Sequence, residues 1–190
     1  MLEVVPVRTQ VRRVVRLLGV DDWRFVAEDR DGVVRELGLG WPIDSGRYFL
    51  DMAEVTYIVH KDLADVYLGE SKCDLAALYS SYPQMSYAWS KFTVLLDLRE
   101  RGRRAKSGYS PRELLYVKGG LKVLILVLEE NTLVSASEIA EWVRSAVMRE
   151  YTPVIAVVDA HGDVTYYSAG LARAEDLGRV YRVEGPARTS

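Results

Sequence analysis

The sequence predicts an α+β fold made of two small domains, and three observations support that prediction. The chain has 190 residues, which is enough to bury two small hydrophobic cores. Both halves contain short β-branched runs typical of strands, beside segments whose apolar residues recur at helical spacing. The longest helical pattern, residues 86–101, lies between the halves. We therefore expect an N-terminal α+β domain over residues 1–84, a C-terminal domain over 85–170 and a tail over 171–190.

Residues 1–45 are expected to form a mostly β region. An apolar run at 11–18 with interspersed arginines and an aromatic run at 23–27 indicate strands. The sequence Asp-Arg-Asp-Gly at 29–32 is typical of a turn, and it leads into residues 33–39 within the same β region.

A helical pattern is expected to begin at Tyr48. The residues that recur at three- and four-residue spacings are Leu50, Ala53, Glu54, Tyr57 and Ile58. Residues 66–68 then indicate a brief strand. Ser71 is predicted to cap the start of a short helix that contains Leu75, Leu78 and Tyr79.

The helix at 86–101 should end at Gly102, after an arginine-rich last turn whose cations complement the helix dipole. Residues 114–118 and 121–128 follow as two predicted strands. Only Gly119-Gly120 separates them, so we expect a tight turn with no room for a functional loop.

A second helix is predicted after residue 135, because Ser135 and Glu138 have the spacing of a capping box. Its buried stripe is expected to consist of Ile139, Ala140, Val143 and Val147. Beyond Gly170 the sequence is polar, and a last strand is predicted at 179–183.

An apolar, β-branched run at 154–158 predicts a strand at the centre of a sheet, covered on both faces. Turn residues follow at 159–163, and residues 164–167 return as a β-branched and aromatic partner strand. The unit is therefore a predicted hairpin with an acidic tip. That tip contains Asp159, His161 and Asp163, and it should face water or a partner.

The composition excludes several classes of protein. With 49% hydrophobic residues, 27% charged residues and a net charge of -2, any nucleic-acid surface must be a local patch. No apolar run approaches the roughly 20 residues of a membrane span, and the N-terminus lacks a signal-peptide core, so we expect a cytoplasmic protein without a membrane partner. Cys73 is the single cysteine, and there are two histidines, so we expect no disulfide, no metal site and no cofactor.

Three segments of the chain resemble the archaeal tRNA-intron endonuclease family. The stretch LLDLRERGRRAKSG at 95–108 is similar to a family segment of the form YRDLRxRGYxVKTG. The stretch AVVDAHGDVTYY at 156–167 is similar to the family hairpin AxVDxxGDxxYY, and residues 49–59 resemble an N-domain helix. Together the segments extend over residues 48–168 in the family's order.

This resemblance implies a fold and a reaction. The fold is a small α+β N-domain followed by an α/β C-domain whose mixed sheet is flanked by helices, as in restriction-endonuclease-like nucleases. The reaction is metal-independent cleavage of precursor tRNA at bulge-helix-bulge intron junctions, leaving 2′,3′-cyclic phosphate and 5′-hydroxyl ends. It needs a base, an acid and a cation near one phosphate, and the family uses tyrosine, histidine and lysine.

The positions that match these catalytic residues depart from the family pattern. The tyrosine position falls near Lys118, and Tyr116 is the nearby phenol. The histidine position falls in a loop shortened here to Gly119-Gly120, near Gly120, and the lysine position falls at Tyr151. At least two of the three functions are missing. The resemblance therefore implies a structural subunit that forms an α2β2 heterotetramer with a paralogous catalytic chain, on a precursor tRNA substrate.

In the family the hairpin loop inserts into a basic pocket between the two domains of an opposing subunit. The resemblance thus implies that Asp159 and Asp163, with His161 between them, dock on a partner's arginine and lysine residues. A solvated hairpin tip is the alternative interpretation. Arg144 matches a family arginine that contacts RNA, although a solvated arginine on the polar side of a helix is the commoner finding.

Two other functions compete with the structural-subunit hypothesis. One is a self-sufficient RNA endonuclease that uses replacement residues such as Tyr116, Lys118 and Tyr151. The other is a non-enzymatic RNA-binding or dimerisation module. Cleavage by the isolated chain would favour the first of these.

Overall fold

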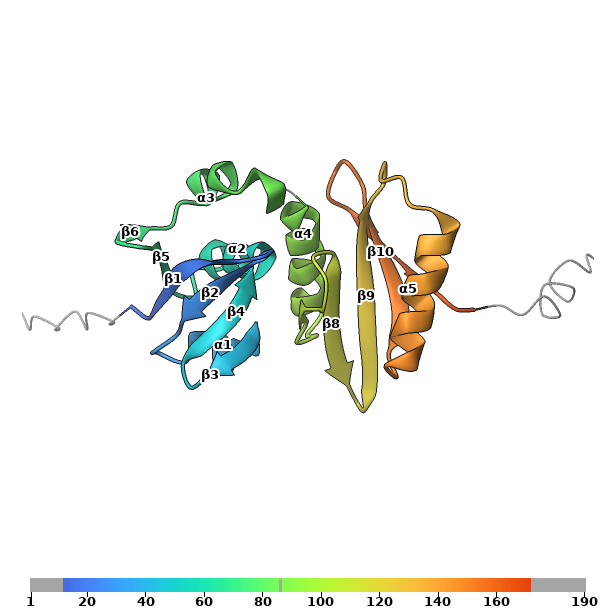
Figure 1. Cartoon of the computed structure of the whole chain (residues 1–190), viewed down its shortest axis with the longest axis horizontal. Coiled ribbons are helices and arrows are strands. Elements are labelled where there is room, and N and C mark those ends of the chain that lie inside the picture. Colours follow the sequence, from blue (N-terminus) through green and yellow to red (C-terminus); the bar gives the residue numbers. More distant parts are fainter. Residues whose placement is uncertain (1–11, 86, 172–190) are drawn as a thin grey trace, which may run out of the picture.

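The computed structural model describes residues 12–85 and 87–171, which form two mixed β-sheets side by side with helices packed on them (Figure 1). The first sheet has the strand order β3-β4-β2-β1-β5-β6. Its strands are β1 (Val14–Asp21), β2 (Arg24–Glu28), β3 (Trp41–Asp44), β4 (Arg47–Asp51), β5 (Asp65–Leu68) and β6 (Ser71–Lys72). The helical elements of this half are α1 (Val33–Leu37), α2 (Met52–His60), α3 (Leu75–Ser81) and the 3-10 turn η1 (Pro83–Met85).

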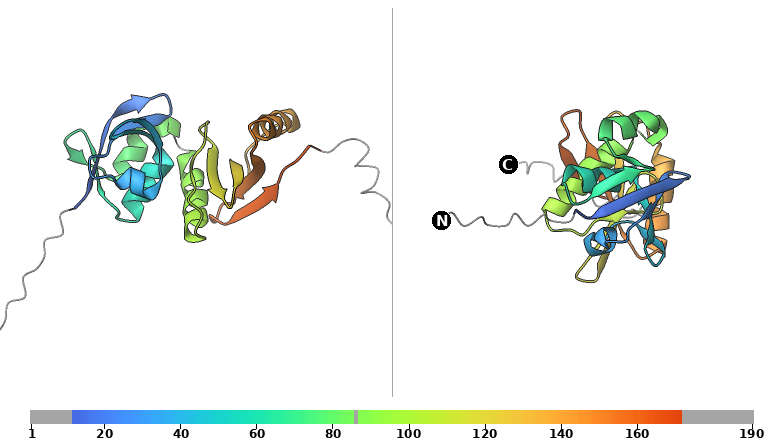
Figure 2. Two further views of the ribbon diagram at one scale, coloured as in Figure 1. Left: turned by 90° about the horizontal axis from the view of Figure 1, so that it is seen from below. Right: turned by 90° about the vertical axis from the view of Figure 1, so that its left-hand side faces the viewer.

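The second sheet has the order β11-β10-β9-β8-β7. Its strands are β7 (Lys106–Ser107), β8 (Glu113–Lys118), β9 (Leu121–Glu129), β10 (Thr152–Val158) and β11 (Val164–Ser168). Two helices, α4 (Ala88–Glu100) and α5 (Ala136–Met148), lie on its opposite faces, as the left view of Figure 2 shows. The expected α+β architecture with a helix-flanked mixed sheet is therefore confirmed.

Helix α4 contributes to two hydrophobic cores. Ala88 and Phe92 at its start pack in the core of the first sheet. Val94, Leu95 and Leu98 pack on the second sheet. The two halves are therefore built around one shared helix, while the division of domains at residue 84 stays a prediction.

Residues 33–39 are not part of a β region, because Val33 and Val34 begin helix α1. The buried carboxylate of Asp29 accepts hydrogen bonds from the amides of both residues, at 2.8 Å each. These amides would otherwise lack partners at the start of a helix. The residue that we expected to open a turn thus stabilises a helix.

The helix predicted to start at Tyr48 starts at Met52 instead, because residues 47–51 form strand β4. Asp51 is the N-cap, and it forms a capping box with Glu54. The predicted N-cap Ser71 lies in strand β6, and Asp74 caps α3 by accepting a hydrogen bond from the Ala76 amide at 3.3 Å.

The predicted hairpin is confirmed, since β10 pairs antiparallel with β11 and parallel with β9. The middle strand of the sheet is β9, however, and β10 lies one strand from the described edge because β11 returns beside it. The Gly119-Gly120 turn also has the expected form, with Lys118 opposite Leu121 and a positive φ at both glycines.

The capping box of Ser135 and Glu138 is present at the start of α5. The buried stripe differs from the prediction, because Val143 and Ala146 are buried while Val147 is 50% exposed. One residue turns a helix by about 100°, so Val147 cannot share the face of Ala146. The strand predicted at 179–183 lies outside the described residues.

A buried polar network joins the two sheets. Lys91 of α4 forms an ion pair with Asp51, and the two side chains are 0% and 1% exposed. The Asp51 carboxylate also accepts from the Ser107 hydroxyl. Glu54 accepts from the amides of Gly40 at 2.8 Å and Ser107 at 3.1 Å, so it links the residue before β3 to β7. Burial, with the Asp51 charge second, raises the pKa of Glu54.

We expect Lys91→Met to lower the free energy of unfolding by about 3–5 kcal/mol, because it leaves the Asp51 carboxylate buried without its cation. Denaturant titration measures the change. Lys61→Met is the matched control, since Lys61 pairs with Glu100 at the surface and should matter little. Equal destabilisation by both substitutions would contradict the central role of the network.

Candidate functional site

The hairpin tip between β10 and β11 is closed by Asp159. Its Oδ1 accepts hydrogen bonds from the amides of His161 at 2.8 Å and Asp163 at 2.9 Å. These backbone donors hold the pKa of Asp159 below its ordinary value of 3.8. The ionised Asp159 carboxylate therefore stabilises the folded tip at a pH above 3.8. This stabilisation is lost as the pH falls through the lower pKa that Asp159 has in the folded state. One carboxylate of the predicted pair thus preorganises the loop.

The other predicted docking residues project from this closed loop. The His161 side chain is 87% exposed, and its Nδ1 lies 3.9 Å from the Asp159 carboxylate. Asp163 is also exposed, and within the described residues its carboxylate has no hydrogen-bond or ion-pair partner. Asp163 is therefore the carboxylate that is available to a partner at this tip.

The positions matched to the family's catalytic residues lie at the opposite end of the sheet, around the turn between β8 and β9 (Figure 1). Tyr116 and Tyr151 are not brought together. Tyr116 packs with the core under α4, whereas Tyr151 packs with the cluster under α5. Lys118 is exposed beside the two-residue turn. These three side chains therefore do not converge on one phosphate-sized site.

A cluster that the sequence analysis missed surrounds Tyr151. The hydroxyls of Tyr109 and Tyr151 lie 2.7 Å apart, and the Arg149 guanidinium lies 4.7 Å from the centre of the Tyr109 ring. The buried Glu113 accepts from the Tyr109 amide at 2.9 Å and from the Trp142 indole at 2.8 Å. The cluster joins two stretches that are far apart in the sequence, residues 109–113 and 142–151, so local patterns gave no signal.

The chemistry of the Tyr109–Tyr151 pair is limited by how tightly the Tyr109 hydroxyl holds its proton. Burial, followed by the hydrogen bond that Tyr109 shares with Tyr151, raises the pKa of Tyr109 to about 12. A general base works best with a pKa near the operating pH. Tyr109 is therefore a poor base at neutral pH, and the pair is better suited to packing or to donating a hydrogen bond.

A basic hollow of about 430 Å³ lies between the two sheets. Its cations are Arg35 of α1, Arg104 and Lys106. Arg104 donates to the carbonyl of Glu36 at 2.7 Å, and Lys106 donates to that of Gly40 at 3.0 Å. Backbone carbonyls fix these two side chains without neutralising their charge. The hollow therefore suits an anionic group.

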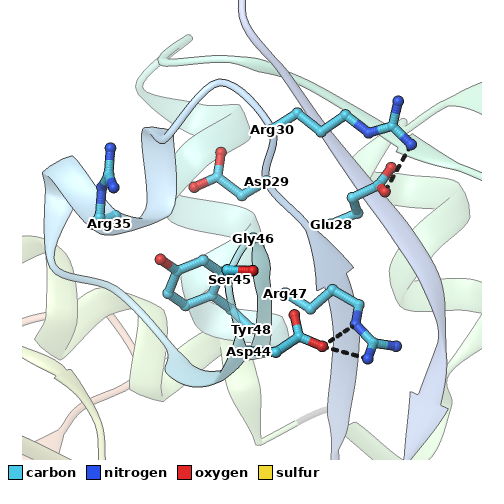
Figure 3. Close-up of a pocket in the computed structure, with 9 residues that line it drawn as sticks. All are labelled: Glu28, Asp29, Arg30, Arg35, Asp44, Ser45, Gly46, Arg47 and Tyr48. Carbon is cyan, nitrogen blue, oxygen red and sulfur yellow. Dashed lines mark hydrogen bonds and ion pairs between the residues drawn. The ribbon is translucent and has the colours of Figure 1, made fainter.

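A neighbouring hollow of about 560 Å³ shares Arg35 and Tyr48 with the basic one (Figure 3). Its other arginines are already paired, Arg30 with Glu28 at 3.0 Å and Arg47 with Asp44. Figure 3 shows both pairs at the wall of the hollow. Of the cations in these two hollows, those without a carboxylate partner among the described residues are therefore the ones that line the hollow between the sheets, namely Arg35, Arg104 and Lys106.

Arg144, the predicted RNA contact, is an exposed residue of α5. An exposed arginine on α5 fits both an RNA contact and a solvated side chain, so the RNA contact of Arg144 stays a prediction. Among residues 12–85 and 87–171, no helix combines the length and apolar character that a membrane crossing requires.

We expect Asp159→Ala to raise the hydrogen-exchange rates of the His161 and Asp163 amides by roughly tenfold, because both lose their acceptor. NMR exchange measurements report on each amide. Asp159→Asn retains an acceptor oxygen and should preserve slow exchange, as should Asp163→Ala. Unchanged protection in Asp159→Ala would show that the tip is held by other contacts.

Comparison with known proteins identifies the family. A family model described as the tRNA intron endonuclease catalytic C-terminal domain matches residues 88–166. A tRNA-splicing endonuclease of Thermococcus gammatolerans is 31% identical over 134 residues, which are 67% of this chain and 80% of the relative. The corresponding protein of Thermococcus kodakarensis is 30% identical over 64% of this chain and 76% of its own length.

A third tRNA-splicing endonuclease, from Methanococcus vannielii, is 29% identical over 171 residues, which cover 80% of this chain and 91% of the relative. Residues 88–166, which the family model matches, include α4, most of the second sheet and the hairpin that carries the acidic tip. The two mixed sheets and their helices agree with the fold of that catalytic domain. The chain belongs to the tRNA-splicing endonuclease family.

Proposed function

We propose that this chain is the non-catalytic, structural subunit of a cytoplasmic tRNA-splicing endonuclease. It combines with a paralogous catalytic chain in an α2β2 heterotetramer, and the assembly cleaves precursor tRNA at bulge-helix-bulge junctions. The observation that supports this role is the separation of Tyr116 and Tyr151 into clusters on opposite faces of the second sheet.

Metal-independent cleavage of RNA requires a base, an acid and a cation within hydrogen-bond reach of one phosphate. The strand pairing argues against such a convergence here. Tyr116 pairs with Val123, and Val123 pairs with Thr152, so these residues share a face and Tyr151 faces the other way. The two glycines between β8 and β9 supply no side chain. The scaffold therefore lacks a complete catalytic set at this position.

Two complementary features support a role in assembly. The Asp159-closed tip presents the Asp163 carboxylate on a preorganised turn, which reduces the entropy lost on docking. The basic hollow between the sheets offers Arg35, Arg104 and Lys106 to an acidic loop. The chain thus has one negative surface and one positive surface for a homologous partner, and each can be satisfied by the opposite surface of that partner.

A self-sufficient nuclease is the second candidate, and the Tyr109–Tyr151 hydroxyl pair beside Arg149 favours it. These groups could donate a proton and stabilise a phosphorane. The raised pKa of Tyr109 leaves the base unassigned, and for this reason we rank the candidate second.

The isolated chain should leave a bulge-helix-bulge RNA intact, whereas the co-expressed pair of this chain and its paralogue should cleave it at both junctions. Gel analysis of a labelled RNA measures both reactions. Tyr151→Phe and Arg149→Ala should leave the rate of the pair within about twofold, because they do not touch the reacting atoms. Cleavage by the isolated chain that Tyr151→Phe abolishes would establish the second candidate instead.

Asp163→Asn should weaken the heterotetramer by about tenfold or more, since it removes a charge that docks on a basic pocket. Analytical ultracentrifugation measures the dissociation constant. The matched control is Glu70→Gln, which removes an exposed carboxylate in the turn before β6 of the first sheet. A tetramer of unchanged stability would argue against docking through this residue.

A further inference from the structure

A second surface lies beside the acidic tip, on its inner side. It is a cleft of about 550 Å³ between the start of α4, the end of β9 and the turn between β10 and β11. Figure 1 shows these three segments at one end of the second sheet. We call it the Trp89 cleft; it is lined by Trp89, Ser90, Thr93, Glu129, Glu130, Asn131 and residues 158–162.

The Trp89 side chain is the unusual feature of this cleft. The residue is 59% exposed, although tryptophan is among the most apolar residues and is highly buried on average. Its ring packs against Phe92 at 5.5 Å and against Tyr79 at 6.3 Å, so the side chain is held in place from the protein side. The outward side of a fixed indole is thus open to a ligand.

The charge of the Trp89 cleft decides the sign of the charge that a ligand must carry. The lining contains the carboxylates of Glu129, Glu130 and Asp159, and it contains no lysine or arginine. Within the described residues neither Glu129 nor Glu130 is paired with a basic side chain, although Glu129 accepts a hydrogen bond from Ser90. Phosphates would be repelled here, so RNA does not fit.

A cation that combines a positive charge with a flat, weakly hydrated face does fit. Arginine stacks on indole rings and forms bidentate contacts with carboxylates, which no metal ion or ammonium group does equally well. In the described part of the chain, no three potential metal ligands gather into a binding group. The cleft therefore matches a guanidinium presented by another protein.

We propose that the Trp89 cleft is a docking site for an arginine side chain of the catalytic partner subunit. The guanidinium stacks on Trp89 and contacts the carboxylates of Glu129 and Glu130. This inference rests on the proposed function and adds a second attachment point to it. The tip presents Asp163 outward to a basic pocket, while the cleft behind the tip receives a basic side chain, so the two contacts reinforce each other and fix the orientation of the partner.

The test measures the affinity of this chain for its co-purified paralogous catalytic subunit by isothermal titration calorimetry. Trp89→Ala should weaken binding by about 30-fold, as expected for an aromatic anchor. The double variant Glu129→Gln with Glu130→Gln should weaken it by about tenfold and should reduce the dependence of affinity on salt. Met148→Ala is the control, because Met148 is 84% exposed on α5 and should leave the affinity unchanged.

Direct contact is tested with 5-fluorotryptophan. The ¹⁹F resonance of Trp89, assigned by its loss in Trp89→Phe, should shift when the partner is added, and thermal melts should show that every variant remains folded. Wild-type affinity in both cleft variants, with the complex still forming, would overturn the inference and leave the proposed function intact.

Two other outcomes also overturn it. If the wild-type chain does not bind the paralogue at all, the inference and the proposed function fail together. If the chain alone forms a homodimer that Trp89→Ala dissociates, the cleft receives a second copy of this chain and the assignment to a different subunit is wrong.

Discussion

The buried ion pair between Lys91 and Asp51 is the interaction on which the arrangement of the two halves depends. Both side chains are almost inaccessible, so each charge requires the other. Ser107 and Glu54 extend the pair across the junction, where backbone amides of both sheets also find their acceptors. The basic hollow lies against the same junction, and its shape therefore depends on this network.

The second sheet has two ends with different properties. At one end, the turn between β8 and β9 is reduced to two glycines, and the nearby aromatic residues are distributed over both faces. At the other end, the hairpin tip and the Trp89 cleft gather exposed carboxylates and an exposed indole. In this chain the acidic tip and the Trp89 cleft thus lie far from the positions where the family resemblance implies catalysis.

Local sequence patterns predicted the elements whose signals are local. The Gly119-Gly120 turn, the capping box of Ser135 and the β10–β11 hairpin depend on neighbouring residues and were predicted correctly. The predicted start of α2 was wrong, because apolar residues of β4 happened to continue the helical spacing until the Asp51 cap. The cluster around Glu113 was missed, since its members become neighbours only through long-range packing. The exposed indole of Trp89 could not be foreseen either, because sequence does not reveal which side of α4 remains uncovered.

Helix α4 has a consequence for the geometry of any assembly that contains this chain. Ala88, Phe92 and Leu96 pack in one hydrophobic core, while Val94, Leu95 and Leu98 pack in the other, so the halves cannot rotate against each other without breaking both. The hairpin tip and the basic hollow are consequently held at a constant separation within the subunit. A subunit built in this way fixes the distance between the neighbours that bind to these two surfaces.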